Sequence, residues 1–174
     1  MKLAPLMMAG SMMTLLASGL SVGERLPELK GEFLTSQEAS LPGVASGRVA
    51  LLLLGFSYDS RFAVEAWVKR FREEFGANPQ VTFYEVPMIG GMARLGKWFI
   101  DSGMRKGTPK KDQENVITVY GGTDPWKHRL GFQSPNAAYL LLVDQHGMVR
   151  WRHSGEFDAK AYDEMSVQVA ALLK

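Results

Sequence analysis

The pattern of apolar positions is clearest in the middle of the chain. An unbroken apolar run at residues 49–56 is typical of a central β-strand that is covered on both faces. Apolar residues then recur at helical spacing, and the expected inward stripe contains Phe62, Ala63, Ala66, Trp67, Phe71 and Phe75. We expect Asp59 or Ser60 to cap this helix at its start, and Gly76 to end it in a left-handed conformation.

A second strand is predicted at residues 81–86, where a β-rich segment ends at Pro87. Together with the preceding elements it forms a strand–helix–strand unit, whose crossover should be right-handed. A second helix is expected at about residues 89–102. Its expected inward residues are Met88, Met92, Leu95 and Phe99, and we place Trp98, Met104 and Trp151 in the core or at its margin.

The C-terminal third predicts a short strand at residues 116–120, a helix start at Asp124-Pro125-Trp126 and a β-hairpin. The hairpin joins residues 138–143 to residues 148–153 and is followed by a helix at about 158–173. This order predicts an α/β protein with a thioredoxin-like fold (βαβ–ββα), an N-terminal extended segment and an inserted strand before the C-terminal hairpin. Alternation alone also permits other α/β folds, but the terminal hairpin and helix narrow the choice.

The N-terminus has a different character. Lys2 precedes a nearly uncharged run from Leu3 to Leu20, which ends in small residues and fits a secretory signal cleaved near Gly19 or Ser21. An uncleaved membrane anchor and a helix packed on the domain are the alternatives. We therefore predict a signal peptide or anchor at residues 1–21 and one domain at 22–174, exported or periplasmic, or membrane-associated through residues 1–20.

Composition agrees with one folded domain. The 174 residues are 46% hydrophobic and 22% charged, which is ordinary for a globular protein. The formal net charge of +2 gives no field that attracts nucleic acid, so no nucleic-acid partner is predicted. The densest basic stretch, residues 105–111, is interpreted as a solvated loop, with contact to a phosphate or a lipid headgroup as the alternative.

The chain contains no cysteine. The segment Ser57-Tyr58-Asp59-Ser60 follows the central strand at the place where a thioredoxin-type protein carries its reactive thiols. Thiol–disulfide exchange and peroxide reduction need an attacking thiolate and a leaving sulfur, and serine supplies neither. Cysteine nucleophiles, thiolate zinc sites and iron–sulfur clusters are therefore excluded. His128, His146 and His153 lack metal-site spacing, so we predict neither a metal nor a cofactor.

Several segments resemble known families. Residues 23–29 and the hairpin at 140–149 resemble the peroxiredoxin and thioredoxin-like superfamily. Trp67 with Phe71 and Phe75, residues 83–89 and the hairpin at 138–151 are more similar to the mitochondrial ATP synthase assembly-factor family (ATPase complex subunit ten). This resemblance runs from about residue 22 to the C-terminus. It implies a thioredoxin-like protein without the thiol pair, which binds and escorts a membrane subunit during ATP synthase assembly.

A second feature of the redox-active relatives is also missing. They carry a cis-proline just before the penultimate strand, and counting back from Asp144 places Ala138 at that position. Pro135 lies three residues earlier, and a longer turn is needed to bring it into place. The absence of thiols and of this proline together favours the non-redox family.

We predict that the site binds a protein or peptide client, and that a membrane protein is one such client. Its candidate residues are Ser57, Tyr58, Asp59, Ser60, Arg61, Glu85, Trp126 and Ala138. Around residues 57–61 the alternative is a simple helix cap, and Trp126 either anchors a partner or packs over the sheet edge. The sequence leaves the oligomeric state open.

Two other functions stay open. The first is an enzyme with non-thiol chemistry, in which Asp59 and Glu85 end successive parallel strands and act with Arg61 as acid and base. The second is a structural relic of a peroxiredoxin-like protein. The chain lacks the Gly-x-Ser-x-Gly elbow, the Walker loop and the Gly-x-Gly-x-x-Gly pattern.

Overall fold

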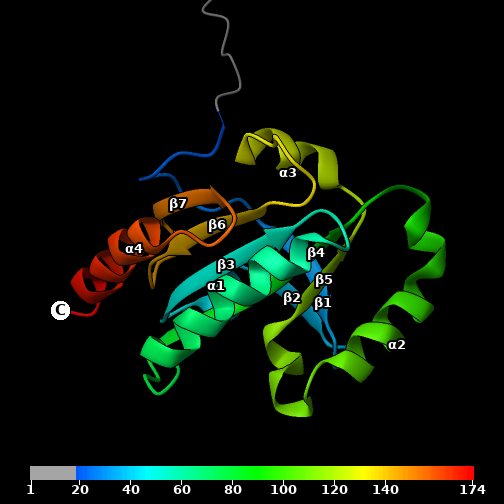
Figure 1. The fold of residues 1–174 in the computed structure, drawn as a ribbon, viewed down its shortest axis with the longest axis horizontal. Helices are drawn as coiled ribbons and strands as arrows, with labels where there is room; N and C mark the ends of the chain where they lie inside the picture. The colour runs from blue at the N-terminus through cyan, green and yellow to red at the C-terminus, as the bar shows by residue number, and fades with distance from the viewer. Residues whose placement is uncertain (1–18) are drawn as a thin grey trace, which may run out of the picture.

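The computed structural model describes residues 19–174, except for the side chains of Met92 and Arg94. A seven-stranded sheet in the order β2-β1-β5-β4-β3-β6-β7 forms its centre (Figure 1). The strands are β1 (Leu29–Phe33), β2 (Glu38–Leu41), β3 (Val49–Gly55), β4 (Val81–Ile89), β5 (Ile117–Tyr120), β6 (Ala138–Val143) and β7 (Val149–Gly155). The α-helices are α1 (Ser60–Phe75), α2 (Lys97–Gly107), α3 (Thr123–Leu130) and α4 (Ala159–Leu172).

The predicted thioredoxin-like fold is confirmed. Strand β3 pairs in parallel with β4 and antiparallel with β6, and β6 forms the expected hairpin with β7. The units β3-α1-β4 and β6-β7-α4 are therefore the predicted βαβ–ββα core. The predicted inserted strand is β5, which pairs in parallel with β4 and antiparallel with β1.

Strand β3 separates two layers of the hydrophobic core. All seven of its residues are buried. Leu51 and Leu53 contact the cluster beneath α1 and α4, whereas Leu52 and Leu54 contact the cluster that includes Trp126 of α3. Alternate side chains of a strand point to opposite faces, so a strand covered on both sides needs the continuous apolar run seen in the sequence.

The N-terminal segment is more regular than its sequence suggested. The segment predicted only as extended continues into the hairpin of β1 and β2, which occupies one edge of the sheet. These strands have five and four residues and mix charged with apolar side chains. Such short edge strands give a weak periodic signal, and their stability comes from pairing with β5.

Helix α1 forms as predicted, but its buried stripe is rotated. Phe62 and Ala66 are exposed, whereas Val64 and Val68 are buried against the sheet. Gly76 does not adopt the predicted left-handed conformation, since its φ of −61° is right-handed. The buried stripe follows the i, i+3, i+4 spacing of the residues that lie directly over β3 and β4.

The second helix differs most from its prediction. Strand β4 continues to Ile89 because its last residues pair with β5, and a 3₁₀ segment at Gly91–Gly96 delays α2 to Lys97. Met88 is buried as expected, but in this strand. Leu95, Trp98 and Phe99, placed inward or at the core margin from the sequence, are 81%, 70% and 76% exposed. The side chain of Met92 lies outside the described part of the structure.

Helix α2 projects beside the sheet instead of covering it (Figure 1). None of the helices within residues 19–174 has the length and apolar character to cross a membrane. The predicted signal peptide or anchor falls within residues 1–18 almost entirely, and thus outside the described residues.

A buried carboxylate fixes the turn between β6 and β7. Asp144, only 3% exposed, accepts hydrogen bonds from the amides of His146 and Met148, both at 2.9 Å, and from Arg150 Nε at 2.7 Å. Burial alone raises the pKa of Asp144, but these donors outweigh it and hold the pKa below the ordinary 3.8. Gly147 completes the turn with a φ of +78°.

We expect Asp144→Ala to lower the free energy of unfolding by about 1–3 kcal/mol at neutral pH, because it removes the buried acceptor of three hydrogen bonds that hold the turn. The depressed native pKa makes this stabilisation present above about pH 4 and lost as the pH falls through the native value. Chemical denaturation at several pH values measures it. The control is Asp124→Ala, whose side chain is 90% exposed. Equal stability of the two variants at neutral pH would contradict the prediction.

Candidate binding surface

The junction between β3 and α1 is closed by two serine hydroxyls. Ser57 Oγ accepts a hydrogen bond from the amide of Ser60 at 3.1 Å and donates one to Asn136 Oδ1 at 2.9 Å. Ser60 Oγ donates to the carbonyl of Ser57 at 2.7 Å. Asp59 stands at the N-cap position, as predicted, but its side chain makes no capping hydrogen bond, and Ser57 Oγ accepts the bond from the amide of Ser60 instead.

Ser60 is a packing residue at this junction. It is 2% exposed, and a Cβ atom on Gly55 would lie 2.4 Å from its hydroxyl oxygen. The close approach of helix to strand thus requires a glycine at the end of β3. Ser60 is not accessible to a partner.

The next turn of α1 presents a different surface. Tyr58 is 74% exposed and Phe62 is 58% exposed. The guanidinium group of Arg61 lies over both rings, 4.0 Å from the centroid of Tyr58 and 4.6 Å from that of Phe62, and it donates a hydrogen bond to the tyrosine hydroxyl. These cation–π contacts favour one arrangement of the two aromatic rings at the surface. We call Tyr58, Arg61 and Phe62 the aromatic stack.

A hollow of about 430 Å³ lies next to this surface, and Phe56, the residue before Ser57, forms part of its wall. It lies at the carboxyl ends of β3 and β4 and at the start of α3, and is lined by Phe56, Met88, Gly90, Gly91, Thr123, Asp124 and Lys127. Its lining combines apolar side chains with one acidic and one basic group. Such a site suits a side chain of a partner molecule.

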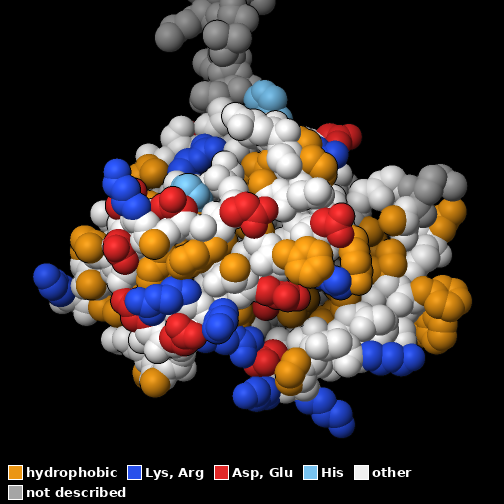
Figure 2. Space-filling model, viewed as in Figure 1, with side chains coloured by type: hydrophobic (Ala, Val, Ile, Leu, Met, Phe, Trp, Pro, Cys, Tyr) orange, Lys and Arg blue, Asp and Glu red, His pale blue; other side chains and the backbone are white. Residues whose placement is uncertain are grey.

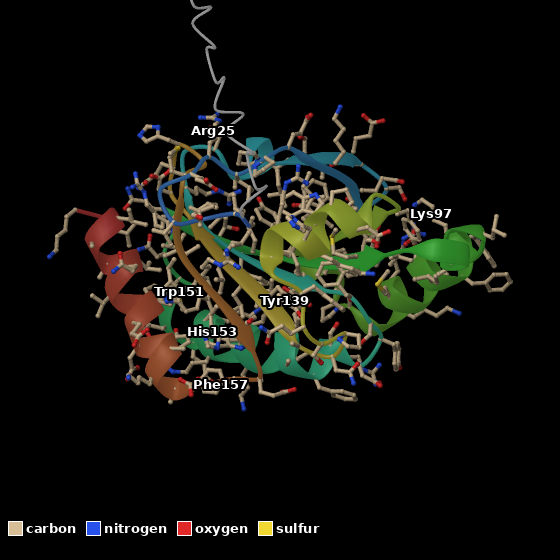
Figure 3. All side chains as sticks on the ribbon, turned by 90° about the horizontal axis from the view of Figure 1, so that it is seen from above. Arg25, Lys97, Tyr139, Trp151, His153 and Phe157 are labelled. Atoms are coloured by element: carbon tan, nitrogen blue, oxygen red, sulfur yellow. The ribbon has the colours of Figure 1, made fainter. Side chains whose placement is uncertain are left out.

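An aromatic cluster supports the loop opposite α1. Phe56 meets Phe132 and Tyr139 edge to face, and Tyr139 lies on β6 near the centre of the molecule (Figure 3). The Tyr139 hydroxyl accepts hydrogen bonds from the amides of Gln133 and Ser134 and donates one to the Ser134 carbonyl. This loop carries Asn136, so the partner of Ser57 is held in place.

Glu85 does not join this surface. It lies within β4 opposite Leu53, four residues before the strand ends, which places it about 13 Å from the carboxyl edge. Burial raises its pKa to about 7, Arg72 lowers it in part, and Glu65 and Asp112 raise it further. The expected acid–base pair of Asp59 and Glu85 at one sheet edge is therefore not formed, because β4 is longer than predicted.

Two further candidates are buried. Trp126 is 5% exposed and belongs to the core, with the Arg129 guanidinium 5.5 Å from its ring centroid, so it packs on the sheet instead of anchoring a partner. Ala138 is fully buried and pairs with Gly55. The cis peptide bond found among residues 19–174 does not precede Pro135.

The histidines show no metal-binding arrangement. Within the described residues no three His, Cys, Asp or Glu side chains are grouped as they are around a metal ion. His153 instead stacks on Trp151, at 16° between the rings, and contacts Trp67. Trp151, His153 and Phe157 follow one another beside α4 (Figure 3). This aromatic group is part of the packing between α1, β7 and α4.

Sequence reasoning missed two residues of the surface. Phe62 fits an inward helical stripe, and only the position of the sheet beneath α1 shows that it is exposed. Asn136 is 79 positions from Ser57 in the chain, and no local pattern signals their contact.

Comparison with known families decides the relationship. A family profile described as "ATP10 protein" matches residues 24–172. The chain belongs to the ATP10 protein family. The resemblance to ATP synthase assembly factors inferred from the sequence is thereby confirmed. A comparison with curated proteins gives no match.

Solved structures share the fold of this ATP10 family member. The thioredoxin domain of a thiol-disulfide oxidoreductase from Bacteroides vulgatus has 20% identity and a TM-score of 0.56, covering 87% of this chain and 99% of that one. A thiol peroxidase from Chromobacterium violaceum has 14% identity and a TM-score of 0.58, covering 90% of each chain. A peroxiredoxin-like protein from Aquifex aeolicus has 20% identity and a TM-score of 0.55, covering 88% of each. At these identities the likeness shows the fold alone.

The buried carboxyl of Glu85 predicts an unusual pH dependence. Its native pKa of about 7 exceeds the ordinary 4.5, so the folded state binds the proton more tightly and stability decreases as the pH rises between these values. We expect Glu85→Gln to raise the free energy of unfolding by about 1–3 kcal/mol near pH 8 and to leave it nearly unchanged near pH 4.

Urea denaturation across this pH range measures the effect. The control is Glu73→Gln, which changes an exposed carboxylate of α1. A Glu85→Gln variant with the same pH profile as the unmodified protein would show that the carboxyl is not perturbed by burial.

Proposed function

We propose that this ATP10 family member is a redox-inactive thioredoxin-like factor that binds a polypeptide client, and that the client is a membrane subunit of ATP synthase during assembly. One observation carries the proposal. At the position where thioredoxin-type proteins carry their thiols, the hydroxyls of Ser57 and Ser60 are consumed by internal hydrogen bonds, while the aromatic stack beside them is exposed. The position has the geometry of a contact surface without a reactive group.

The composition of this surface favours a polypeptide. Tyrosine and arginine are among the residues that most often supply binding energy in protein interfaces. Here the Arg61 guanidinium limits the motion of both rings, so little conformational entropy is lost when a partner covers them. The hollow beside Phe56 is large enough to accept a side chain of the client.

The absence of cysteine supports binding without electron transfer. Neither disulfide exchange nor peroxide reduction has a nucleophile or a leaving sulfur in this chain. Acid–base catalysis by Asp59 and Glu85 requires the two carboxyl groups to be close together, whereas Glu85 lies within β4, four residues before the end of the strand. A membrane client agrees with an exported or membrane-associated protein, for which the apolar run from Leu3 to Leu20 is the sequence basis.

The test replaces the native protein in cells with the variant Tyr58→Ser/Arg61→Ser/Phe62→Ser. All three side chains are largely exposed or outside the core, so we expect the variant to keep its thermal unfolding midpoint. The amount of assembled ATP synthase in the membrane, measured on native gels, should fall several-fold because the client is no longer held.

The matched control is Val167→Ser, which removes an apolar side chain that is 65% exposed on α4. It should support normal assembly. A folded stack variant that also supports normal assembly would overturn the proposed client-binding role.

A further inference from the structure

Helix α2 is attached to the domain by its polar side. Lys97 Nζ lies 2.8 Å from Asp101 and 2.9 Å from Glu32 of β1. The Tyr120 hydroxyl of β5 donates a hydrogen bond to the other Asp101 oxygen at 2.6 Å. Asp101 is 4% exposed and is the residue of α2 that is fully buried. An ion pair and a phenol therefore hold the first half of the helix.

The second half is held in the same way. Arg105 Nε donates a hydrogen bond to the Leu34 carbonyl at 2.7 Å, and its Nη2 donates one to Ser36 Oγ at 3.1 Å. Gln113 bonds the Arg105 and Thr108 carbonyls near the end of the helix. These contacts fix the orientation of α2 from end to end.

Three large apolar side chains of this segment are exposed. Leu95, Trp98 and Phe99 are 81%, 70% and 76% exposed, and the two rings meet edge to face with 4.8 Å between centroids. Figure 2 shows hydrophobic side chains gathered over α2 at the right edge of the molecule, with basic side chains beneath them. A helix of a globular protein normally buries its apolar side. The inverted arrangement marks this face as an interaction site.

Positive charge is concentrated beside these rings. Residues 97–111 contain five Lys or Arg and a single acidic residue, Asp101, whereas the whole chain has a net charge of only +2. Lys106 lies seven residues after Phe99, two helical turns along the same face, and is exposed. Lys110 and Lys111 follow and are exposed as well.

The neighbouring acidic groups only partly offset this charge. Asp112 is bound by Arg72 at 2.9 Å, and Asp101 and Glu32 share Lys97. Glu114 is the exposed carboxylate that follows the basic residues. The outer face of α2 therefore combines two exposed aromatic rings with an exposed lysine, Lys106, and two further exposed lysines follow the helix at positions 110 and 111.

We propose that the outer face of α2 docks on the surface of an anionic lipid bilayer. Trp98 and Phe99 enter the boundary between headgroups and acyl chains, where aromatic rings of interfacial helices lie. Lys106, Lys110 and Lys111 contact the lipid phosphates, and their aliphatic stems lie along the membrane surface. A bilayer matches this face because exposed aromatic rings beside exposed lysines are the composition of helices that lie at a membrane interface.

This membrane contact is separate from the client site. The aromatic stack lies at the start of α1, whereas the docking face belongs to another helix beside the β1 and β5 part of the sheet (Figure 1). Docking therefore leaves the aromatic stack free, and either role survives if the other is wrong.

The absence of cysteine allows a clean experiment. In the full-length chain, Trp98→Cys introduces a single thiol for a polarity-sensitive fluorophore such as NBD. Val167→Cys, on α4, receives the same label as the matched control. Each protein is titrated with vesicles of phosphatidylcholine alone and with vesicles that also contain phosphatidylglycerol. The label reports on α2 itself, whatever residues 1–20 do.

We expect a blue shift and several-fold stronger emission at position 98 with the anionic vesicles, and little change at position 167. Salt near 1 M, where the Debye length is about 3 Å, should abolish the response. Lys106→Gln/Lys110→Gln/Lys111→Gln in the labelled chain should weaken vesicle binding by about fivefold per charge, on the order of a hundredfold in total.

Three outcomes would overturn the proposal. If the emission of the label at position 98 does not change with either kind of vesicle, a protein is left as the partner of this face. If the labels at positions 98 and 167 respond alike, the binding belongs to another part of the chain. Equal response to neutral and anionic vesicles would exclude the role of the lysines.

Discussion

Burial of β3 on both faces is the constraint on which the rest of the structure depends. An apolar strand in the middle of a sheet must be covered from both sides, so α1 and α4 lie over one face and α3 over the other. Its last residue, Gly55, allows α1 to approach so closely that Ser60 fills the junction. The position of the first helical turn, and hence of Tyr58, Arg61 and Phe62, follows from this packing.

The same packing determines which side chains occupy the position of the reactive thiols at the start of α1. In the ATP10 family member the two serines that flank Tyr58 and Asp59 close the helix start, and both of their hydroxyl protons are donated to groups of the same chain. The side chains between and after them are free of the core and exposed. The position that carries the reactive thiols in a cysteine-containing thioredoxin-type protein is here an exposed aromatic surface.

Much of the fold was predictable because its elements bury regular patterns. The β6–β7 hairpin and α4 were located correctly from alternation, the Asp-x-x-Gly turn and helical periodicity, and each buries its apolar face as the rules assume. Helix α2 violates that assumption: its aromatic residues Trp98 and Phe99 are exposed, and polar residues hold it to the sheet. Periodicity shows that a helix has two faces, but only tertiary contacts show which one is buried.

The candidate site was less predictable for a related reason. Ser57 and Tyr58 were found because they follow the central strand, a local relation that sequence preserves. Glu85 was misplaced because the length of β4 depends on pairing with β5, and Trp126 proved to be core because α3 packs on the sheet. The contact of Ser57 with Asn136 joins distant segments.

The most direct test of the central claim is crosslinking in cells from a photoreactive amino acid at position 58, with position 167 as the control. If the aromatic stack binds the client, the photoreactive residue at position 58 should crosslink to an ATP synthase membrane subunit, and the one at position 167 should not. Failure to capture any such subunit at position 58, or equal capture at both positions, would contradict it.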